Sequence, residues 1–519
     1  MRAPMRSKAV RSPTTHVIST PAPLGGWNTR DGLSEMPPQD AIALENWMPR
    51  TAYVEVRGGY EAHATGMTGT GKTLVSYNTL TGTHELYCAT ASGVYNVTAA
   101  GPVGSAVAVR TNGKHQTALF GDGTNNYLIM VNGVDSPLYY NGTSWVAVTG
   151  ISSPALTGLT TTTLVSVNSF KGRLFFIQNN SLSFWYLPAA AAGGALTQFD
   201  LTGECKRGGF LMAMGTWTRD GGAGQDDTAV FITSEGEAIV YQGTNPSSSA
   251  SWAKVGSYYI GKPVGRRCVT QLGGDLVIIT ENGTYPLSAA LQSAAIDYKN
   301  ALSFKIEPTF TTAARLYADV FGWEATVFPA QAAMIVNVPH AEGGTHKQYV
   351  MNTITKAWCE FTGWNAEAFC VMDSVLYFTT GTTVKKAWTG HVDGSDRIIA
   401  YGKTSFNYFG TRGSVKRFTL FRPTLISNGE MAYRTDIDVD FEDDVMAAPP
   451  TYSVVAEGVW DSSLWDVGYW VSGLEIVKRW TTVSAWPGFC VAGKVKVSTN
   501  LLDIQWTACD YVFERGGTL

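Results

Sequence analysis

The sequence contains few charged residues and has no excess of basic ones. Of its 519 residues, 15% are Asp, Glu, Lys or Arg, and the formal net charge at pH 7 is −4. A protein that holds nucleic acid through its phosphates needs a basic face that displaces counterions. The composition therefore argues against tight, sequence-independent binding of nucleic acid.

Paired cysteines and catalytic motifs are also lacking. The seven cysteines are scattered, odd in number and contain no C-x-x-C pair, and the seven histidines are dispersed. Disulfide frameworks and structural zinc sites need paired cysteines at short spacings. The sequence has neither the G-x-S-x-G nor the H-E-x-x-H motif. We therefore expect no catalytic residue, no cofactor and no metal.

No apolar stretch is long enough to cross a bilayer. The most apolar one, residues 181–196, is short and is interrupted by Pro188 and by two adjacent glycines. The N-terminal residues are basic but lack the apolar core of a signal peptide. We therefore expect no signal peptide and no membrane segment, and the scattered cysteines favour synthesis in a reducing cytoplasm.

What the sequence does contain is a repeat. Between about residues 85 and 389, two short apolar runs separated by a polar or glycine-containing break occur seven times. The first runs begin near Leu86, Leu128, Leu174, Val230, Leu276, Met334 and Leu376. Each copy predicts two strands joined by a tight hairpin. Strand-only repeats of about 40–50 residues are typical of β-propellers, so we expect an all-β fold with a propeller of six or seven blades.

The regions outside the repeat differ from it in composition and in hydrophobic pattern, so the sequence predicts four segments. Residues 1–23 are rich in Pro, Ser, Thr and basic residues and are expected to be a mobile N-terminal arm. In residues 24–65 we expect one short helix after Pro37 and Pro38, packed on a platform domain. Residues 66–400 would form the propeller. Residues 401–519 alternate with period two, which predicts an antiparallel β domain, the platform.

Several segments carry a family resemblance. Residues 24–50, 56–66 and 127–145, together with the ending DYVFERGGTL, resemble the tail nozzle (tail tubular protein B-like) proteins of short-tailed bacteriophages. The resemblance implies a structural virion protein of the phage tail, a subunit of a homohexameric ring that extends the portal and adaptor channel. The ring would conduct or retain genomic DNA for ejection, without sequence-specific binding. Implied partners are the head–tail adaptor and portal ring, a tail fibre or tailspike, and tail needle or tip proteins.

One nucleotide-binding motif occurs in the wrong context. Residues 66–73 fit G-x-x-x-x-G-K-[ST], in which backbone amides hold phosphates and the lysine, here Lys72, reaches the terminal phosphates. That chemistry needs an apolar strand before the loop and a helix after it. A polar segment precedes this motif, and the residues after it predict strand, turn and strand. We therefore reject a nucleotide site.

An acidic run begins at Asp436. Its alternating carboxylates could bind Ca²⁺, but Phe441 stands where an EF-hand loop needs glycine, and Ala447 stands where it needs glutamate. In a strand, Asp436, Asp438 and Asp440 share one face. We favour a solvated acidic strand face over a cation site.

Three tryptophans, Trp460, Trp465 and Trp470, follow at intervals of five residues. Exposed rings could stack on sugars, whereas buried rings would anchor a subunit contact. We favour the assembly role. The alternative for the whole chain is a propeller glycosidase or a glycan-binding protein acting on host surface polysaccharide, because blade loops can bring distant carboxylates together.

Overall fold

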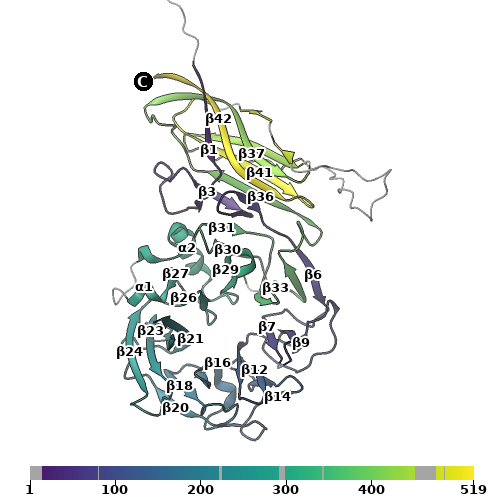
Figure 1. Cartoon of the computed structure of the whole chain (residues 1–519), viewed down its shortest axis with the longest axis vertical. Coiled ribbons are helices and arrows are strands. Elements are labelled where there is room, and N and C mark those ends of the chain that lie inside the picture. Colours follow the sequence, from purple (N-terminus) through teal and green to yellow (C-terminus); the bar gives the residue numbers. More distant parts are fainter. Residues whose placement is uncertain are drawn as a thin grey trace, which may run out of the picture. The chain divides into compact units, whose positions relative to one another are not determined.

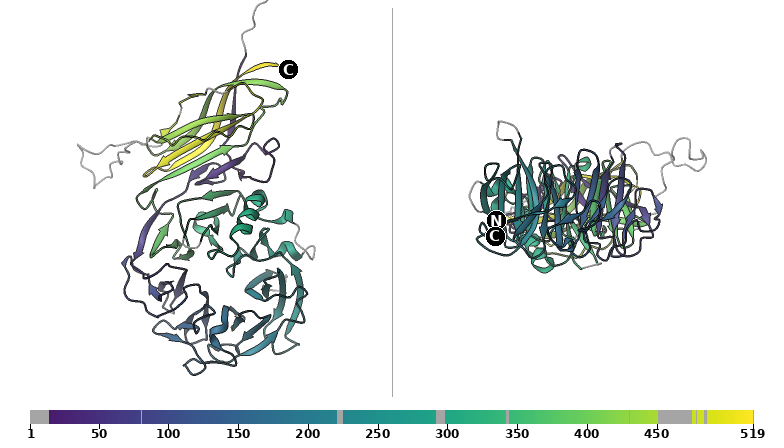
Figure 2. Two further views of the ribbon diagram at one scale, coloured as in Figure 1. Left: turned by 180° about the vertical axis from the view of Figure 1, so that it is seen from behind. Right: turned by 90° about the horizontal axis from the view of Figure 1, so that it is seen from below.

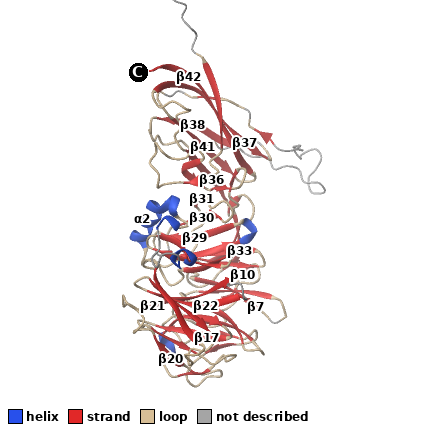
Figure 3. Ribbon diagram, turned by 60° about the vertical axis from the view of Figure 1, so that its left-hand side comes forward, coloured by secondary structure: helices blue, strands red, loops and turns tan. Residues whose placement is uncertain are grey.

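The computed structural model describes residues 14–79, 81–220, 225–291, 298–341, 344–429, 431–450, 475–477, 479–483 and 486–518. Strands dominate these residues, and the helices are short (Figure 3). The helices are α1 (Leu287–Leu291), α2 (Glu307–Tyr317), η1 (Thr161–Thr163), η2 (Tyr298–Asn300), η3 (Phe304–Ile306) and η4 (Pro329–Gln331). The chain divides into two compact units, Met1–Arg57 with Arg397–Leu519, and Gly58–Asp396. The all-β expectation is confirmed.

The unit Gly58–Asp396 is a β-propeller, and its described residues form seven blades around a common axis (Figures 1 and 2). From the centre outward, blade 1 contains β7 (Thr73–Asn78), β8 (His84–Ala89) and β9 (Val94–Asn96), and blade 2 contains β11 (Gln116–Gly121), β12 (Asn126–Val131), β13 (Leu138–Tyr140) and β14 (Trp145–Ala147). Blade 3 contains β16 (Leu164–Phe170), β17 (Arg173–Gln178), β18 (Ser183–Tyr186) and β20 (Thr197–Asp200). Blade 4 contains β21 (Leu211–Asp220), β22 (Gln225–Thr233), β23 (Glu237–Gly243) and β24 (Trp252–Tyr259). Blade 5 contains β25 (Val269–Leu272), β26 (Asp275–Thr280) and β27 (Gly283–Pro286). Blade 6 contains β28 (Glu324–Phe328), β29 (Ala333–Pro339), β30 (His346–Asn352) and β31 (Trp358–Phe361). Blade 7 contains β32 (Ala368–Met372), β33 (Val375–Thr380), β34 (Thr383–Ala387) and β6 (Tyr60–Thr65). Short strands complete the unit: β10 (Gly101–Pro102), β15 (Leu156–Thr157), β19 (Gly194–Ala195) and β35 (Val392–Asp393).

The seven hairpins of the sequence repeat are the second and third strands of the seven blades. The second strand of each blade contains a continuous apolar run because both of its faces are covered by neighbouring blades. In β17, Leu174 and Phe176 pack in the layer shared with blade 2, whereas Phe175 and Ile177 pack in the layer shared with blade 4. The core is therefore a series of layers between blades.

The propeller closes by pairing its first strand with its last blade. Strand β6 pairs antiparallel with β34 and becomes the outer strand of blade 7. The inner strands then contact one another in order, from β7 through β32 and back to β7. Because β6 belongs to a blade, the propeller begins at Gly58 and not at residue 66, where the composition had placed the boundary.

The other unit, here called the platform, contains two sheets. One sheet contains β1 (Thr15–Pro21), β4 (Trp47–Pro49), β5 (Val54–Val56), β37 (Ser414–Ser427), β39 (Glu475–Ile476), β40 (Thr481–Thr482) and β42 (Ile504–Thr518). The other contains β2 (Gly26–Trp27), β3 (Asp40–Glu45), β36 (Asp396–Thr404), β38 (Ala432–Val439) and β41 (Val491–Thr499). The sheets face each other closely, since a Cβ on Gly402 would lie 2.6 Å from the Trp506 ring and one on Gly493 would lie 2.6 Å from Phe421. Glycine is needed at both positions.

Two expectations for the N-terminal segment are wrong. The residues after Pro38 form strands β3 and β4 instead of a helix, because β3 pairs with β36 and buries Ala41 and Leu44. Tertiary pairing overrides the helix propensity of this alanine-containing segment. Of the expected mobile arm, Thr15–Pro21 is strand β1, which pairs along its whole length with β42. Residues 1–13 lie outside the described residues.

Candidate functional site

The inner strands of the propeller surround a central cavity of about 530 Å³. Residues from β7, β11, β16, β21, β25, β28 and β32 line it, so every blade contributes. Thr73, His115, Arg267 and Glu324 all line this cavity close to the starts of their inner strands, at a place here called the mouth. Side chains from several blades interact with one another at the mouth, which makes it the site to examine.

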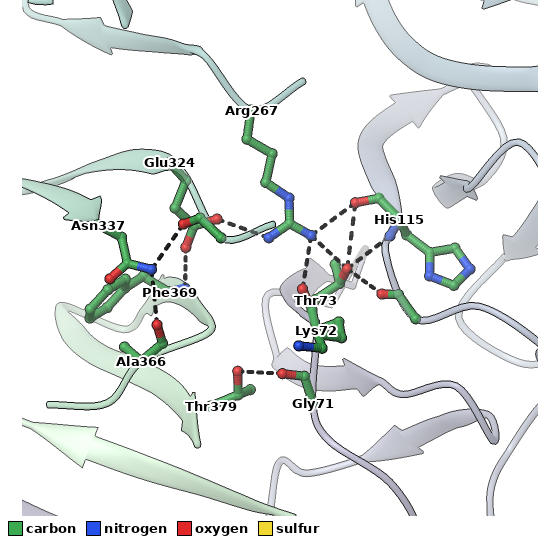
Figure 4. Close-up of polar contacts among 12 residues, drawn as sticks. Gly71, Lys72, Thr73, His115, Arg267, Glu324, Asn337, Ala366, Phe369 and Thr379 are labelled. Atoms are coloured by element: carbon green, nitrogen blue, oxygen red, sulfur yellow. Dashed lines mark hydrogen bonds and ion pairs between the residues drawn. The ribbon is translucent and has the colours of Figure 1, made fainter. Parts of the chain in front are cut away.

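Arg267 ties four blades together at the mouth (Figure 4). It enters from the loop before β25 in blade 5, and its Nη1 donates to Oε2 of Glu324 in blade 6 over 2.9 Å. Its Nη2 donates to the Thr73 hydroxyl over 2.6 Å and to the carbonyl oxygen of Lys72 over 3.0 Å, both at the start of blade 1. The same nitrogen donates to the carbonyl oxygen of His115, at the start of blade 2, over 3.1 Å.

The acceptors of Arg267 are themselves held in place. The Thr73 hydroxyl donates to the Gly113 carbonyl over 2.7 Å and accepts the backbone N–H of His115 over 2.9 Å. The second oxygen of Glu324 accepts the backbone N–H of Phe369 in blade 7. We call the set Thr73, His115, Arg267 and Glu324 the staple, because it joins blades across the axis.

Burial shifts the titration of two groups of the staple. Burial raises the pKa of Glu324, and the neighbouring Arg267 guanidinium works in the opposite direction. Burial lowers the pKa of His115 to about 4, so the imidazole is neutral at pH 7. The staple therefore contains a buried acid matched to one guanidinium, on a side chain that is only 14% exposed.

A second ion pair lies beside the staple. Lys72 Nζ is 2.9 Å from Oε2 of Glu367, and His346 Nε2 is 3.7 Å from the other oxygen of that carboxylate. Burial alone would raise the pKa of Glu367, but the nearby His346 and the Lys72 ammonium outweigh it and lower the pKa. The ring centroid of Phe321 is 5.1 Å from Lys114 Nζ and 5.0 Å from the Arg267 guanidinium, a cation–π arrangement.

The rejected nucleotide motif lies in this region, and its context is that of a strand. The predicted order of strand, turn and strand after it is confirmed, since Thr73 begins β7 and β8 follows. The Lys72 side chain is directed to Glu367. A phosphate-binding loop needs a helix at this place, whose amides point at the phosphates.

The prediction of a solvated acidic strand face is wrong for its central residue, Asp438. Asp436 is exposed, but Asp438 is 2% exposed and lies between two buried lysines, Lys403 of β36 and Lys494 of β41. Asp440 lies beyond β38 in a turn, and its Oδ1 accepts backbone N–H groups.

The reason is that the chain folds back over this face of the sheet after β38. Lys403 Nζ donates to the Glu442 carbonyl and Lys494 Nζ donates to the Asp444 carbonyl, each over 3.1 Å. This return covers Asp438 and excludes water from it. Period-two alternation correctly placed Asp438 on one face, but it could not show what covers that face.

The predicted assembly residues Trp460, Trp465 and Trp470 lie outside the described residues. Sequence reasoning missed Arg267, Lys403 and Lys494. The available signal was weak: in a chain with few charges, an Arg-Arg pair precedes a strand, and lysines alternate with Val in β41. In the part of the chain that the structure describes, no helix is long and apolar enough to span a membrane.

Comparison with known proteins bears on the fold alone. No protein-family model and no curated protein matches this chain. It is similar to the β-propeller domain of Cps50 (Swd1) from Myceliophteria thermophila, with 10% identity and a TM-score of 0.39 over 63% of this chain and 99% of that one. It is similar to YCF48 bound to D1 peptide, with 9% identity and a TM-score of 0.36 over 63% and 96%.

A further similarity is to the extracellular domain of a hybrid two-component system from B. thetaiotaomicron, with 10% identity and a TM-score of 0.39. The match covers 63% of this chain and 41% of that one, so this chain spans less than half of that domain. At these identities and TM-scores the similarities carry no argument about function.

Proposed function

We propose that the protein is a structural component of a virion, a subunit of the six-membered tail nozzle ring of a short-tailed bacteriophage. The ring continues the channel of the portal and the head–tail adaptor and conducts or retains genomic DNA. The resemblance of residues 24–50, 56–66 and 127–145 and of the C-terminal residues to tail nozzle proteins supports this proposal.

The observation that carries the proposal is where the resembling segments lie. Residues 24–50 and the C-terminal strand β42 belong to one unit, the platform, although the whole propeller separates them in sequence. Residues 127–145 form the hairpin of blade 2. The resembling segments from the two ends of the chain therefore belong to the same unit.

The geometry of the propeller restricts where DNA would pass. The central cavity of about 530 Å³ has the size of a small-molecule pocket, about 300–1,000 Å³. Arg267 crosses its mouth and bonds to three other blades. The DNA channel of the proposed ring therefore runs between subunits, and the propeller serves as a closed, stiff building block around it.

The experiment that tests the proposal is a reconstruction of the intact particle by electron microscopy. We expect six copies of the chain around the tail axis, next to the adaptor, with density for DNA or an open channel on the axis. A different copy number, or a position away from the axis, would refute the proposal. The net charge of −4 per chain predicts that purified protein retains no DNA at physiological ionic strength.

The alternative of a propeller glycosidase or glycan-binding protein is not proposed. The two carboxylates at the propeller mouth, Glu324 and Glu367, are each engaged by a cation, whereas glycoside hydrolysis needs an acid and a base or nucleophile that face the sugar. The alternative is still an outcome of the test. Release of sugar from host polysaccharide by the purified protein, together with a position off the axis, would favour it.

A further inference from the structure

A buried lysine and a buried aspartate face each other across two strands of the platform. Strand β41 lies between β36 and β38, and Lys494 is directly opposite Lys403 on one side and Asp436 on the other. Asp438 lies two residues further along β38, on the same face as Asp436. Lys494 is 0% exposed, Asp438 is 2% exposed and Lys403 is 3% exposed.

The contacts place the amine of Lys494 against the carboxyl group of Asp438. Lys494 Nζ donates a hydrogen bond to Asp438 Oδ1. Lys403 Nζ lies 2.6 Å from the other oxygen, Oδ2. Asp436 Oδ2 is 3.7 Å from Lys494 Nζ, and the Asp436 side chain is half exposed. Lys494 and Asp438 are therefore shielded from water, and the half-exposed Asp436 carboxylate lies between Lys494 and the solvent.

We propose that Lys494 and Asp438 form an intramolecular isopeptide bond. An amine and a carboxyl group condense slowly in water because they are hydrated, charged and rarely in contact. Here the two groups are in contact and are almost completely removed from water. The fixed contact replaces a bimolecular encounter, and the excluded water cannot hydrolyse the product.

The groups around the pair supply the proton transfers. The lone pair of Lys494 Nζ attacks Cγ of Asp438, the C–N bond forms, and the bond from Cγ to Oδ2 breaks. Counted from the ammonium and the carboxylate, Lys494 Nζ gives up two protons, one before its lone pair attacks and one after the C–N bond has formed, and it keeps the third as the amide hydrogen. Both protons pass through Asp436 and Lys403 to Oδ2, and that oxygen leaves as one water molecule. Oδ1 becomes the amide carbonyl oxygen, and Lys403 and Asp436 end in the protonation states in which they began. No oxidant or reductant is needed.

Lys403 and Asp436 act as positioning and proton-transfer groups. The ammonium group of Lys403 polarises the carboxyl group by its contact with Oδ2, and Asp443 Oδ1 holds that ammonium at 2.8 Å. Asp436 accepts protons from Lys494 at the solvent side. The bond would join residues that are 56 positions apart. The segment between β38 and β41 then becomes a covalently closed loop, and the paired strands β38 and β41 cannot separate at the position of the bond.

Intact-mass spectrometry of the denatured wild-type protein tests the proposal. We expect a mass lower than the sequence mass by one water molecule, and a protease digest that contains one branched peptide joining Asp438 and Lys494. The full sequence mass, with the two peptides recovered separately from both fresh and aged protein, would overturn the proposal. Neither result depends on the folding of a variant.

Three variants sharpen the test. Lys494→Arg keeps the charge but cannot form this amide, so its mass must equal its sequence mass. Asp438→Asn must lose ammonia instead of water and give a product identical to that of the wild type. Asp436→Asn should slow the appearance of the branched peptide by at least tenfold without changing its identity. A branched peptide that persists in Lys494→Arg would place the bond elsewhere and overturn the assignment.

Discussion

Replacement of Arg267 by methionine tests whether the staple stabilises the propeller. Methionine keeps much of the apolar length of the side chain but removes the guanidinium and its bonds to Glu324, Thr73 and two backbone carbonyls. The side chain of Glu324 is only 9% exposed, so its carboxylate loses its cation without gaining water. We expect a lower free energy of unfolding of the propeller.

The size of the effect follows from the unpaired acid. Removing one partner of a buried ion pair costs about 3–5 kcal/mol. The propeller has about 340 residues, and an unfolding entropy of about 2 cal/mol/K per residue gives about 0.7 kcal/mol/K. The melting temperature of Arg267→Met should therefore fall by about 4–7 °C near neutral pH.

The effect should depend on pH in a direction that the structure sets. Burial raises the pKa of Glu324 above that of the unfolded chain, and Arg267 limits the rise. A raised native pKa stabilises the fold below the unfolded pKa, and this stability is lost as the pH rises through the native pKa. Without Arg267 the native pKa rises further, so the variant takes up a proton at higher pH and recovers stability on acidification. The melting-temperature deficit should be larger at about pH 8 than at about pH 5.

Differential scanning calorimetry measures both quantities, and the neighbouring arginine supplies a matched control. Arg266 donates to the carbonyl oxygens of Leu211 and Met212. Arg266→Met removes neutral hydrogen bonds, so its deficit should be smaller and should not vary with pH in this range. The double variant Arg267→Met with Glu324→Gln removes the unpaired charge and should melt higher than Arg267→Met alone.

Two results would refute the reasoning. An Arg267→Met protein that melts within about 1 °C of the wild type at about pH 8 would show that the staple contributes no net stability. A deficit of the expected size that is the same at both pH values would show that loss of packing, and not the unpaired Glu324 carboxylate, is responsible.

Three further predictions concern other parts of the chain. Lys72→Met should lower the melting temperature, because it leaves Glu367 buried with one cation fewer, and neither protein should hydrolyse ATP; turnover that the variant abolishes would contradict the rejected nucleotide site. Trp465→Ala should reduce incorporation into particles, as measured by quantitative blotting; normal incorporation with lost adsorption would favour a receptor role. Gly236→Ala should destabilise the propeller by more than about 1 kcal/mol in chemical unfolding, because φ is +81° and a Cβ would lie 2.4 Å from the backbone of Gly261; unchanged stability would contradict the close approach.

The propeller could be predicted from the sequence because its signal is local and repeated. The second strand of a blade is covered on both faces, so it contains a continuous apolar run such as residues 174–177, and a short turn follows it. The inner and outer strands contain no comparable repeated apolar run. The exact number of blades within the expected six or seven therefore came from the strand pairing.

The staple and the lysine–aspartate site could not be predicted in the same way. Arg267 meets Thr73 across 194 positions, and Lys494 meets Asp438 across 56. Sequence patterns reveal buried positions only when several residues recur at a regular spacing, and a single buried charged residue forms no such pattern. Its burial depends on a segment that folds over it, as residues 442–444 fold over Asp438.

The sequence by itself determined the all-β class, the hairpins of the seven blades and the alternation of the platform strands, because turn chemistry and the two-residue period of a strand act between near neighbours. Only the tertiary structure decided that the residues after Pro38 form a strand, that β6 closes the ring in blade 7, and which lysines meet Asp438. These outcomes depend on which distant strand offers unpaired hydrogen-bonding groups and which surface loses its water, and both are properties of the assembled chain.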